Sequence, residues 1–288
     1  MKHATLPALF LLLSGCVIGG DKHPRPRDLS PSWLVDRTRI LGVQATPPEA
    51  HIGETVSFEV LLPDPEEHVD LVAWLACSSE ESSDFGCTLD GQDWQTGEAM
   101  IGLQPVYDPS YTVPDDALAT GEKAYVLIQV LALPQMAISE DTGEQTGEDL
   151  DFNEVEAGFK RLVVSSSSEP NNNPVIQDLL FNGVATTADE PVEVIAGSSN
   201  EWTLDLSEDS VETYTYSNQH GEDEERIEEP FALWYTNGGS LLESVTLYPY
   251  FTADWIAPQE LGYEGTFWAV VRDRRGGLSW VERAFVVH

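Results

Sequence analysis

One cysteine near the start of the sequence has surroundings that indicate a specific chemistry. Cys16 follows the small residues Ser14 and Gly15, after an apolar run, 6–13, that begins behind the basic start 1–3. The run is too short to cross a bilayer, which needs about 20 apolar residues. Its length and basic flank are typical of the central segment of a secretory signal peptide. The small side chains would let a peptidase reach the bond that precedes Cys16.

The stretch Leu13-Ser14-Gly15-Cys16 resembles the lipobox of bacterial lipoproteins. The resemblance implies that residues 1–15 are removed and that Cys16 becomes an N-terminus carrying a diacylglyceryl thioether and an N-acyl chain such as palmitate. Each buried CH₂ contributes about 0.8 kcal/mol, so two or more chains anchor a protein stably where one does not. Val17 replaces the aspartate that retains many lipoproteins at the inner membrane. The resemblance therefore implies anchoring in a Gram-negative outer membrane, with the membrane face left open.

Residues 16–34 separate this cysteine from the rest of the chain. They contain Gly19-Gly20 and the prolines Pro24, Pro26 and Pro31, with few apolar side chains. Chains of this composition stay semi-extended, at most about 3.1 Å per residue where polyproline-like. We expect a flexible spacer that holds the folded part away from the membrane.

Composition restricts the partners of the protein. The chain has 288 residues, of which 41% are hydrophobic, so about two domains with proper cores are expected. Removal of residues 1–15 takes away only Lys2, which leaves 13 Lys and Arg against 50 Asp and Glu and a net charge of −37. Nucleic-acid binding needs clustered Lys and Arg, so it is excluded. The charge permits cationic partners or divalent cations, and it is also a common adaptation to salt.

Two cysteines remain after Cys16, namely Cys77 and Cys87. An even pair in an exported protein predicts a disulfide between them. Closing so small a loop contributes roughly 3 kcal/mol in the chain-entropy model. The two cysteines are too close in sequence to be the bond that joins the sheets of antibody domains.

The sequence contains two copies of one design. Pro114 and Pro258 each stand between an extended step and a β-rich strand, and they are 144 residues apart. Gly53 and Gly197 are separated by the same 144 residues. Trp74 and Trp234 are 160 apart, and the closing strands around Val163 and Val286 are 123 apart. The differences predict two insertions, in acidic segments within 134–156 and 207–230, which we expect to be loops.

Each copy has the pattern of short strands. Residues 55–62 alternate polar and apolar side chains, as half-buried strands do, and 123–133 is rich in β-branched and aromatic residues. Proline and glycine recur about every ten residues, and no stretch keeps a helical period. The sequence predicts an all-β protein built from two β-sandwiches.

The endings of the copies resemble tandem immunoglobulin-like domains of bacterial surface proteins. The relevant stretch is Trp255-Ile256-Ala257-Pro258, then a Trp-Ala-Val-Val-Arg-Asp strand and Gly276-Gly277. The resemblance implies immunoglobulin-like β-sandwich domains at 35–166 and 175–288. A polar linker at 167–174 would join them.

The familiar enzyme signatures are absent from the sequence. It has no Gly-x-Ser-x-Gly elbow, no His-Glu-x-x-His helix and no phosphate-binding glycine loop, and its histidines are scattered. We predict a non-enzymatic protein without a cofactor. Asp149, Asp151 and Asn153 supply alternate oxygen ligands, but Glu154 and Lys160 stand where an EF-hand needs glycine and glutamate. A looser calcium site in the acidic loops stays open.

Two other clusters bear on partners. Tyr214 and Tyr216, with the segment 248–251, either line a carbohydrate platform or pack in the core. Arg272, Arg274 and Arg275 either face an acidic loop of a neighbouring domain or form an ordinary charged hairpin tip, which we favour. The sequence predicts a membrane-anchored envelope lipoprotein for binding, adhesion or envelope assembly, with an unknown protein or glycan partner. The alternative is a glycan- or calcium-binding accessory that serves an enzyme or transporter.

Overall fold

The computed structural model describes residues 30–65, 67, 69–78, 82–83, 86–87, 100–104, 109–118, 122–134, 155–217, 220 and 222–288. Residues Ser32–His288 form one compact unit, and of the residues before it only 30 and 31 are described. The predicted signal peptide and Cys16 therefore lie outside the described residues. Within the described part of the chain, no helix has the length and apolar character needed to cross a membrane.

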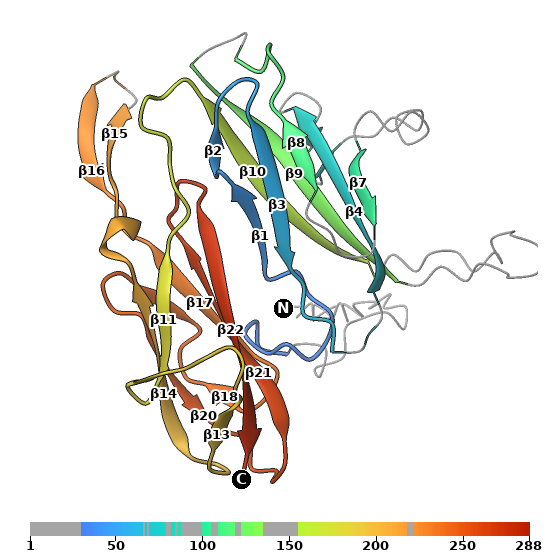
Figure 1. Ribbon diagram of the computed structural model, residues 1–288, viewed down its shortest axis with the longest axis vertical. Helices are drawn as coiled ribbons and strands as arrows, with labels where there is room; N and C mark the ends of the chain where they lie inside the picture. The colour runs from blue at the N-terminus through green and yellow to red at the C-terminus, as the bar shows by residue number, and fades with distance from the viewer. Residues whose placement is uncertain are drawn as a thin grey trace, which may run out of the picture. The chain divides into compact units, whose positions relative to one another are not determined.

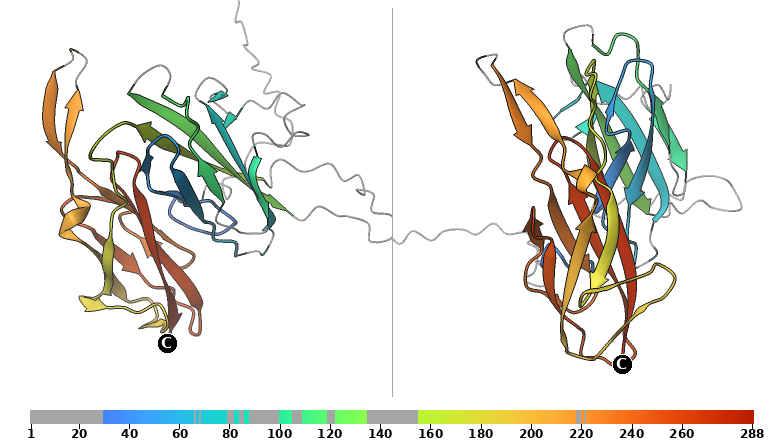
Figure 2. Two further views of the ribbon diagram at one scale, coloured as in Figure 1. Left: turned by 45° about the horizontal axis from the view of Figure 1, so that its top comes forward. Right: turned by 60° about the vertical axis from the view of Figure 1, so that its left-hand side comes forward.

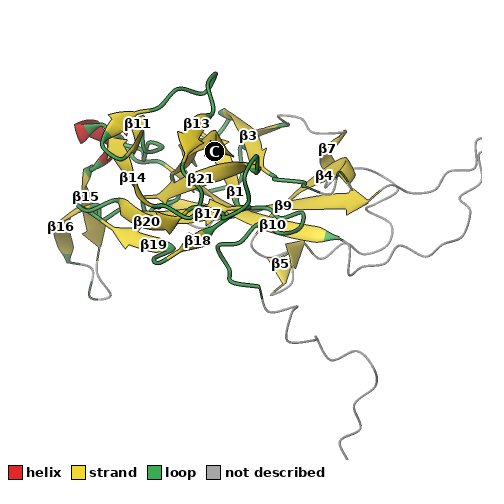
Figure 3. Ribbon diagram, turned by 90° about the horizontal axis from the view of Figure 1, so that it is seen from below, coloured by secondary structure: helices red, strands yellow, loops and turns green. Residues whose placement is uncertain are grey.

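Among the described residues, strands make up nearly all of the regular structure, and the one helical segment is short and is shown in red in Figure 3. The first half of the compact unit has a three-stranded sheet in the order β1-β3-β8 and a five-stranded sheet in the order β2-β10-β9-β4-β7 (Figure 1). A small separate pair is formed by β5 and β6. The bounds are β1 Gly42–Thr46, β2 Glu49–Ala50, β3 Thr55–Leu61, β4 Val69–Ser78, β5 Ser82–Ser83, β6 Gly86–Cys87, β7 Met100–Gln104, β8 Ser110–Thr112, β9 Lys123–Pro134 and β10 Glu156–Ser165.

The second half has two five-stranded sheets, in the orders β12-β11-β14-β20-β18 and β13-β22-β21-β17-β19. A separate hairpin, β15-β16, follows the short helix η2. The bounds are β11 Ile176–Phe181, β12 Val184–Ala185, β13 Val192–Val194, β14 Ser199–Leu206, η2 Glu208–Ser210, β15 Thr213–Ser217, β16 Asp223–Ile227, β17 Phe231–Thr236, β18 Ser240–Leu241, β19 Val245–Leu247, β20 Thr252–Ile256, β21 Glu264–Arg272 and β22 Leu278–Val287.

The two halves share one strand plan, which confirms the predicted all-β fold of two tandem β-sandwiches. The order β1-β3-β8 matches β11-β14-β20, and β2-β10-β9-β4-β7 matches β13-β22-β21-β17-β19. In each half a short strand pairs in parallel with the last strand, β2 with β10 and β13 with β22. Gly53 and Gly197, the predicted counterparts, both have positive φ, at 76° and 67°, which glycine adopts at little cost.

Each sandwich has its own apolar core. In the first, Phe58 on β3 faces Trp74 on β4, with ring centroids 6.1 Å apart. In the second, Phe267 on β21 stacks on Trp202 at 4.5 Å and also contacts Trp234 and Trp255. These side chains are all buried, as the alternation of apolar residues along the strands predicts.

A third apolar cluster joins the two halves. It contains Val35, Leu41 and Leu61 with Trp268, Val270 and Leu278. Residues 33 and 34, predicted as the end of the spacer, also pack on the second half. Trp33 contacts the apolar core of the second sandwich, and Leu34 forms a β-bridge with Thr236. A fragment that starts at residue 35 would lose both contacts.

The insertion at 207–230 is a β-hairpin and not the predicted loop. Residues 213–217 alternate threonine or serine with tyrosine, and both types favour strands. They pair with residues 223–227 over five positions. The hairpin stands apart from the two larger sheets, as the orange strands in Figure 2 show. Most of the other insertion, at 135–154, lies outside the described residues.

Candidate functional site

A charged cluster forms where the β21–β22 turn meets the segment that connects the halves. Asp273 begins the turn, and its carboxylate accepts backbone hydrogen bonds from Arg275, Gly276 and Gly277 at 2.7–2.9 Å. These bonds use the carboxylate to hold a tight turn whose glycines leave room beside it. The turn directs the Arg275 side chain back toward the protein, where it is only 17% exposed.

Three glutamates surround the Arg275 guanidinium. Its Nη1 lies 3.0 Å from Glu212 Oε2 and 2.9 Å from Glu228 Oε1, and its Nη2 lies 3.7 Å from Glu49 Oε2. The ring of Tyr214 stacks on the guanidinium, 4.5 Å from centroid to Cζ. Glu49 belongs to β2 of the first sandwich, whereas the other partners belong to the second. Arg275 therefore ties the two sandwiches together.

The asparagines of the predicted linker complete this joint. Asn171, which is 1% exposed, donates from its backbone to Glu49 at 3.1 Å and from its amide to Asp273 at 2.7 Å. Asn172 donates to Glu212 at 2.7 Å. Asn173 donates to the Ala45 carbonyl at 2.8 Å and accepts from the Leu278 backbone at 3.0 Å. The linker is thus hydrogen-bonded to both halves. We call Glu49, Lys160, Asn171, Glu212, Glu228, Asp273 and Arg275 the polar joint.

Burial changes the acidity of two groups in the polar joint. Desolvation raises the pKa of Glu228 to about 6, and the nearby Asp273 adds to the rise, although bonds from the Glu212 backbone and Arg275 oppose it. Desolvation lowers the pKa of Lys160 to about 8, against the attraction of Asp273. The Lys160 ammonium donates to the Gly276 carbonyl. Four carboxylates share two cations here, so the joint keeps its charges only through many hydrogen bonds.

We expect Lys160 to make stability rise with pH in the alkaline range. Its folded pKa lies below the unfolded value of 10.5, so the folded state favours the neutral amine, and stability increases as pH rises from about 8 to 10.5. The full gain is about 3 kcal/mol. Urea unfolding of the wild type and Lys160→Met at pH 7, 8.5 and 10 should show this gain only in the wild type. Lys123→Met controls for the loss of one exposed cation, and parallel pH curves for wild type and Lys160→Met would contradict the prediction.

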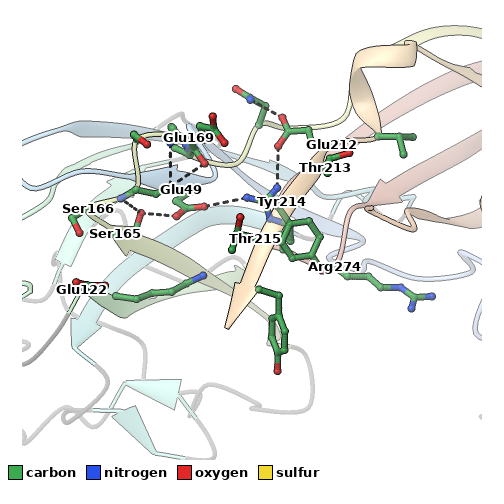
Figure 4. A pocket seen from close by; sticks show the side chains of 18 of the residues that line it. Glu49, Glu122, Ser165, Ser166, Glu169, Glu212, Thr213, Tyr214, Thr215 and Arg274 are labelled. Carbon is green, nitrogen blue, oxygen red and sulfur yellow. Dashed lines mark hydrogen bonds and ion pairs between the residues drawn. The ribbon is translucent and has the colours of Figure 1, made fainter. Parts of the chain in front are cut away.

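A groove of about 1370 Å³ borders the polar joint. One wall is the segment 165–170 with the start of β9, and the other is β15 with η2. Figure 4 shows Glu49 and Ser165 joined on one side, with Thr213, Tyr214 and Thr215 on β15. Ser165 Oγ donates to Glu49 Oε1 at 2.5 Å, and that carboxylate also serves Arg275. The nearby His51 places its Nδ1 3.0 Å from the Ser165 backbone carbonyl oxygen, whereas the Ser165 hydroxyl donates to Glu49.

The structure describes only some of the residues that the sequence predicts to form a disulfide or a metal site. Cys77 is buried and disulfide-bonded, while its pairing with Cys87 stays a prediction because the Cys87 side chain lies outside the described residues. Asp149, Asp151 and Asn153 also lie outside them. Among the residues that are described, no group of three or more His, Cys, Asp or Glu could hold a metal ion.

The tyrosines separate into two environments. Tyr214 and Tyr216 line the groove, which fits the predicted platform better than core packing. Phe251 is buried at 6% exposure, whereas Tyr250 is 80% exposed and takes no part in the groove lining. The 248–251 segment is therefore not part of one platform with Tyr214.

The preferred interpretation of the arginine cluster is wrong for Arg275. Arg274 is exposed, as a hairpin tip predicts, but Arg275 faces acidic groups, including Glu49 of the other sandwich. Sequence reasoning also missed the roles of Glu49, Asn171, Glu212 and Glu228. The Asp-Arg-Arg-Gly-Gly sequence at 273–277 could have indicated an unusual turn, but the neighbouring residues do not identify the partners of its side chains.

Comparisons with known proteins find solved structures with low sequence identity and low TM-scores. No family model matches the sequence, and no curated protein does. Murine CEACAM1b is 10% identical, with 86% of this chain and 100% of that chain covered and a TM-score of 0.23. Dimeric latent PorU from Porphyromonas gingivalis is 11% identical, with 88% of this chain and 24% of that chain covered and a TM-score of 0.24. A membrane-anchored protein from Corynebacterium diphtheriae is 12% identical, with 85% of this chain and 58% of that chain covered and a TM-score of 0.23. Scores this low assign no function to the chain.

Proposed function

We propose that this chain is a lipid-anchored, non-enzymatic binding module of the bacterial cell envelope. The observation that carries the proposal is the polar joint, in which Arg275 and Asn171, with the neighbouring Asn173, fasten two sandwiches into one unit. Two β-sandwiches held in this way suit the presentation of a fixed surface better than movement during a reaction cycle. The lipobox-like stretch that ends at Cys16 supports attachment of this unit to the outer membrane by lipid.

The lipid anchor is tested by metabolic labelling. In a Gram-negative host fed an alkyne fatty acid, the wild-type chain should take up label, and Cys16→Ala should lose essentially all of it. The variant should also keep residues 1–15, since cleavage follows lipid transfer in the lipobox pathway. Cys87→Ala is the matched control and should keep the label. Equal labelling of wild type and Cys16→Ala would contradict the anchor.

The non-enzymatic role is tested separately. The detergent-solubilised mature protein should leave peptide, ester and glycoside substrates unchanged in a broad hydrolysis screen. Turnover that copurifies with the protein, and that persists after a second independent purification, would overturn this part of the proposal.

A glycan-binding accessory role is the second candidate. The observation that favours it is the set of tyrosines, Tyr125, Tyr214 and Tyr216, in the lining of the groove. Tyrosine rings provide flat apolar faces with a polar edge, which suits sugar rings. Binding to a glycan array that Tyr125→Ala removes would favour this role, and silence on the array would remove it.

A further inference from the structure

We infer that the groove beside the polar joint binds an extended, Lys- or Arg-bearing peptide segment of a protein partner, which adds as a strand to β15. This inference rests on the proposed binding role and names the class of ligand. The groove volume of about 1370 Å³ exceeds the roughly 300–1,000 Å³ of typical small-molecule pockets. A segment of several residues fits a space of this size better than one small molecule does.

The edge of β15 supplies the backbone contacts. Among the described strands, β15 pairs only with β16. In an antiparallel pair every second residue directs its backbone N–H and C=O away from the partner strand. Four consecutive residues, 213–216, line the groove, so both faces of the strand and the edge between them border it. An added strand would satisfy this edge, as in β-augmentation.

The charge of the lining selects a cationic occupant. Six carboxylates and three cationic groups line the groove, which leaves three negative charges in excess. Glu49 and Glu212 are already paired with Arg275. Within the described part of the chain, no ion pair joins the exposed side chains of Glu122, Glu169, Glu208 or Asp209. These carboxylates are available to Lys or Arg of a partner.

The tyrosines favour cations over sugars. The Arg226 guanidinium lies 3.9 Å from the ring centroid of Tyr216, and Arg275 lies 4.5 Å from that of Tyr214. Each ring therefore already has an arginine on one face, which limits stacking by a sugar and shows that the rings accept guanidinium groups. Tyr125, on the other wall of the groove, is 46% exposed and offers a further ring.

The inference is tested with a defined peptide and matched charge variants. The probe is a fluorescent eight-residue peptide that alternates Lys and Val, titrated with detergent-solubilised mature protein at about 0.15 M salt, where long-range attraction is screened. Glu122→Gln with Glu169→Gln should weaken binding about fivefold, because two partly exposed charge contacts are lost. Glu193→Gln with Glu264→Gln removes the same charge from exposed sites outside the groove lining and should change the Kd less than twofold.

Chemical variants of the peptide separate strand addition from simple charge attraction. N-methylation at each valine keeps every charge but removes backbone donors, so it should weaken binding at least tenfold if the peptide adds to β15. The inference would be overturned if the two double variants lost the same amount of affinity. It would also be overturned if the methylated and unmethylated peptides bound with equal affinity. If the peptide does not bind but a neutral oligosaccharide does, and Tyr125→Ala abolishes that binding, the inference is overturned in favour of glycan recognition. Either failure leaves the lipid-labelling result intact, so it is distinguishable from failure of the proposed function.

Discussion

Replacement of Arg275 with methionine should lower the free energy of unfolding by about 3–5 kcal/mol at pH 8, as expected when one partner of a buried ion pair is removed. The substitution leaves Glu228, whose side chain is 2% exposed, and Glu49, at 7%, without their cation. It also removes the stacking partner of Tyr214. Urea unfolding of the detergent-solubilised mature protein measures the change.

The size of this loss should depend on pH. The folded pKa of Glu228 is about 6 and its unfolded value 4.5, so the folded state binds this proton more tightly. Its contribution to stability is fully present below 4.5 and is lost as pH rises through about 6. Without Arg275 the folded pKa should rise further. The destabilisation of Arg275→Met should therefore shrink as pH falls from 8 to 5.

The neighbouring arginine provides the matched control. Arg274 is 52% exposed and lies 3.9 Å from Glu229, which is 74% exposed. Surface pairs of this kind contribute about 0–1 kcal/mol, so Arg274→Met should have little effect. Adding Glu228→Gln to Arg275→Met should recover part of the loss, because a buried charge is removed with its partner. Similar losses for the two single arginine variants, or a loss independent of pH, would contradict the assigned role of Arg275.

Truncation of Phe267 to alanine should destabilise the protein by about 3–5 kcal/mol, the usual cost of removing a buried phenylalanine. Phe267 is 0% exposed and lies between Trp202, Trp234 and Trp255, so three rings lose a neighbour at once. For a chain of this size the melting temperature should fall by roughly 10 °C. Near-ultraviolet circular dichroism follows the tryptophans directly.

Two comparisons test the assignment of this loss to core packing. Tyr250→Ala removes an aromatic ring that is 80% exposed and should change the melting temperature by less than about 2 °C. Phe267→Leu keeps most of the volume and should fall between the wild type and Phe267→Ala. Equal melting temperatures for Phe267→Ala and Tyr250→Ala would show that Phe267 is not central to the core.

The strand pattern and the repeat could be predicted from local sequence. Alternation of polar and apolar side chains over 55–62 predicts β3, with Val56 and Phe58 buried. Gly53 and Gly197 are separated by the same 144 residues as Pro114 and Pro258, which predicts two copies of one design. Both positions have a positive φ, which explains why each is a glycine. Such signals are local because a strand's side chains alternate between faces whatever its partners are.

The polar joint depended on tertiary structure. Asn171 lies in a run of serine, asparagine and proline that reads as a linker, yet it is buried against Glu49 and Asp273, 122 and 102 residues away in sequence. Arg275 reads as a charged hairpin tip, yet it meets Glu49 of the other sandwich. A charged side chain carries no local mark of its partner. Pairing across such distances is set by strand register and by the packing of the two sandwiches, which only the folded chain brings together.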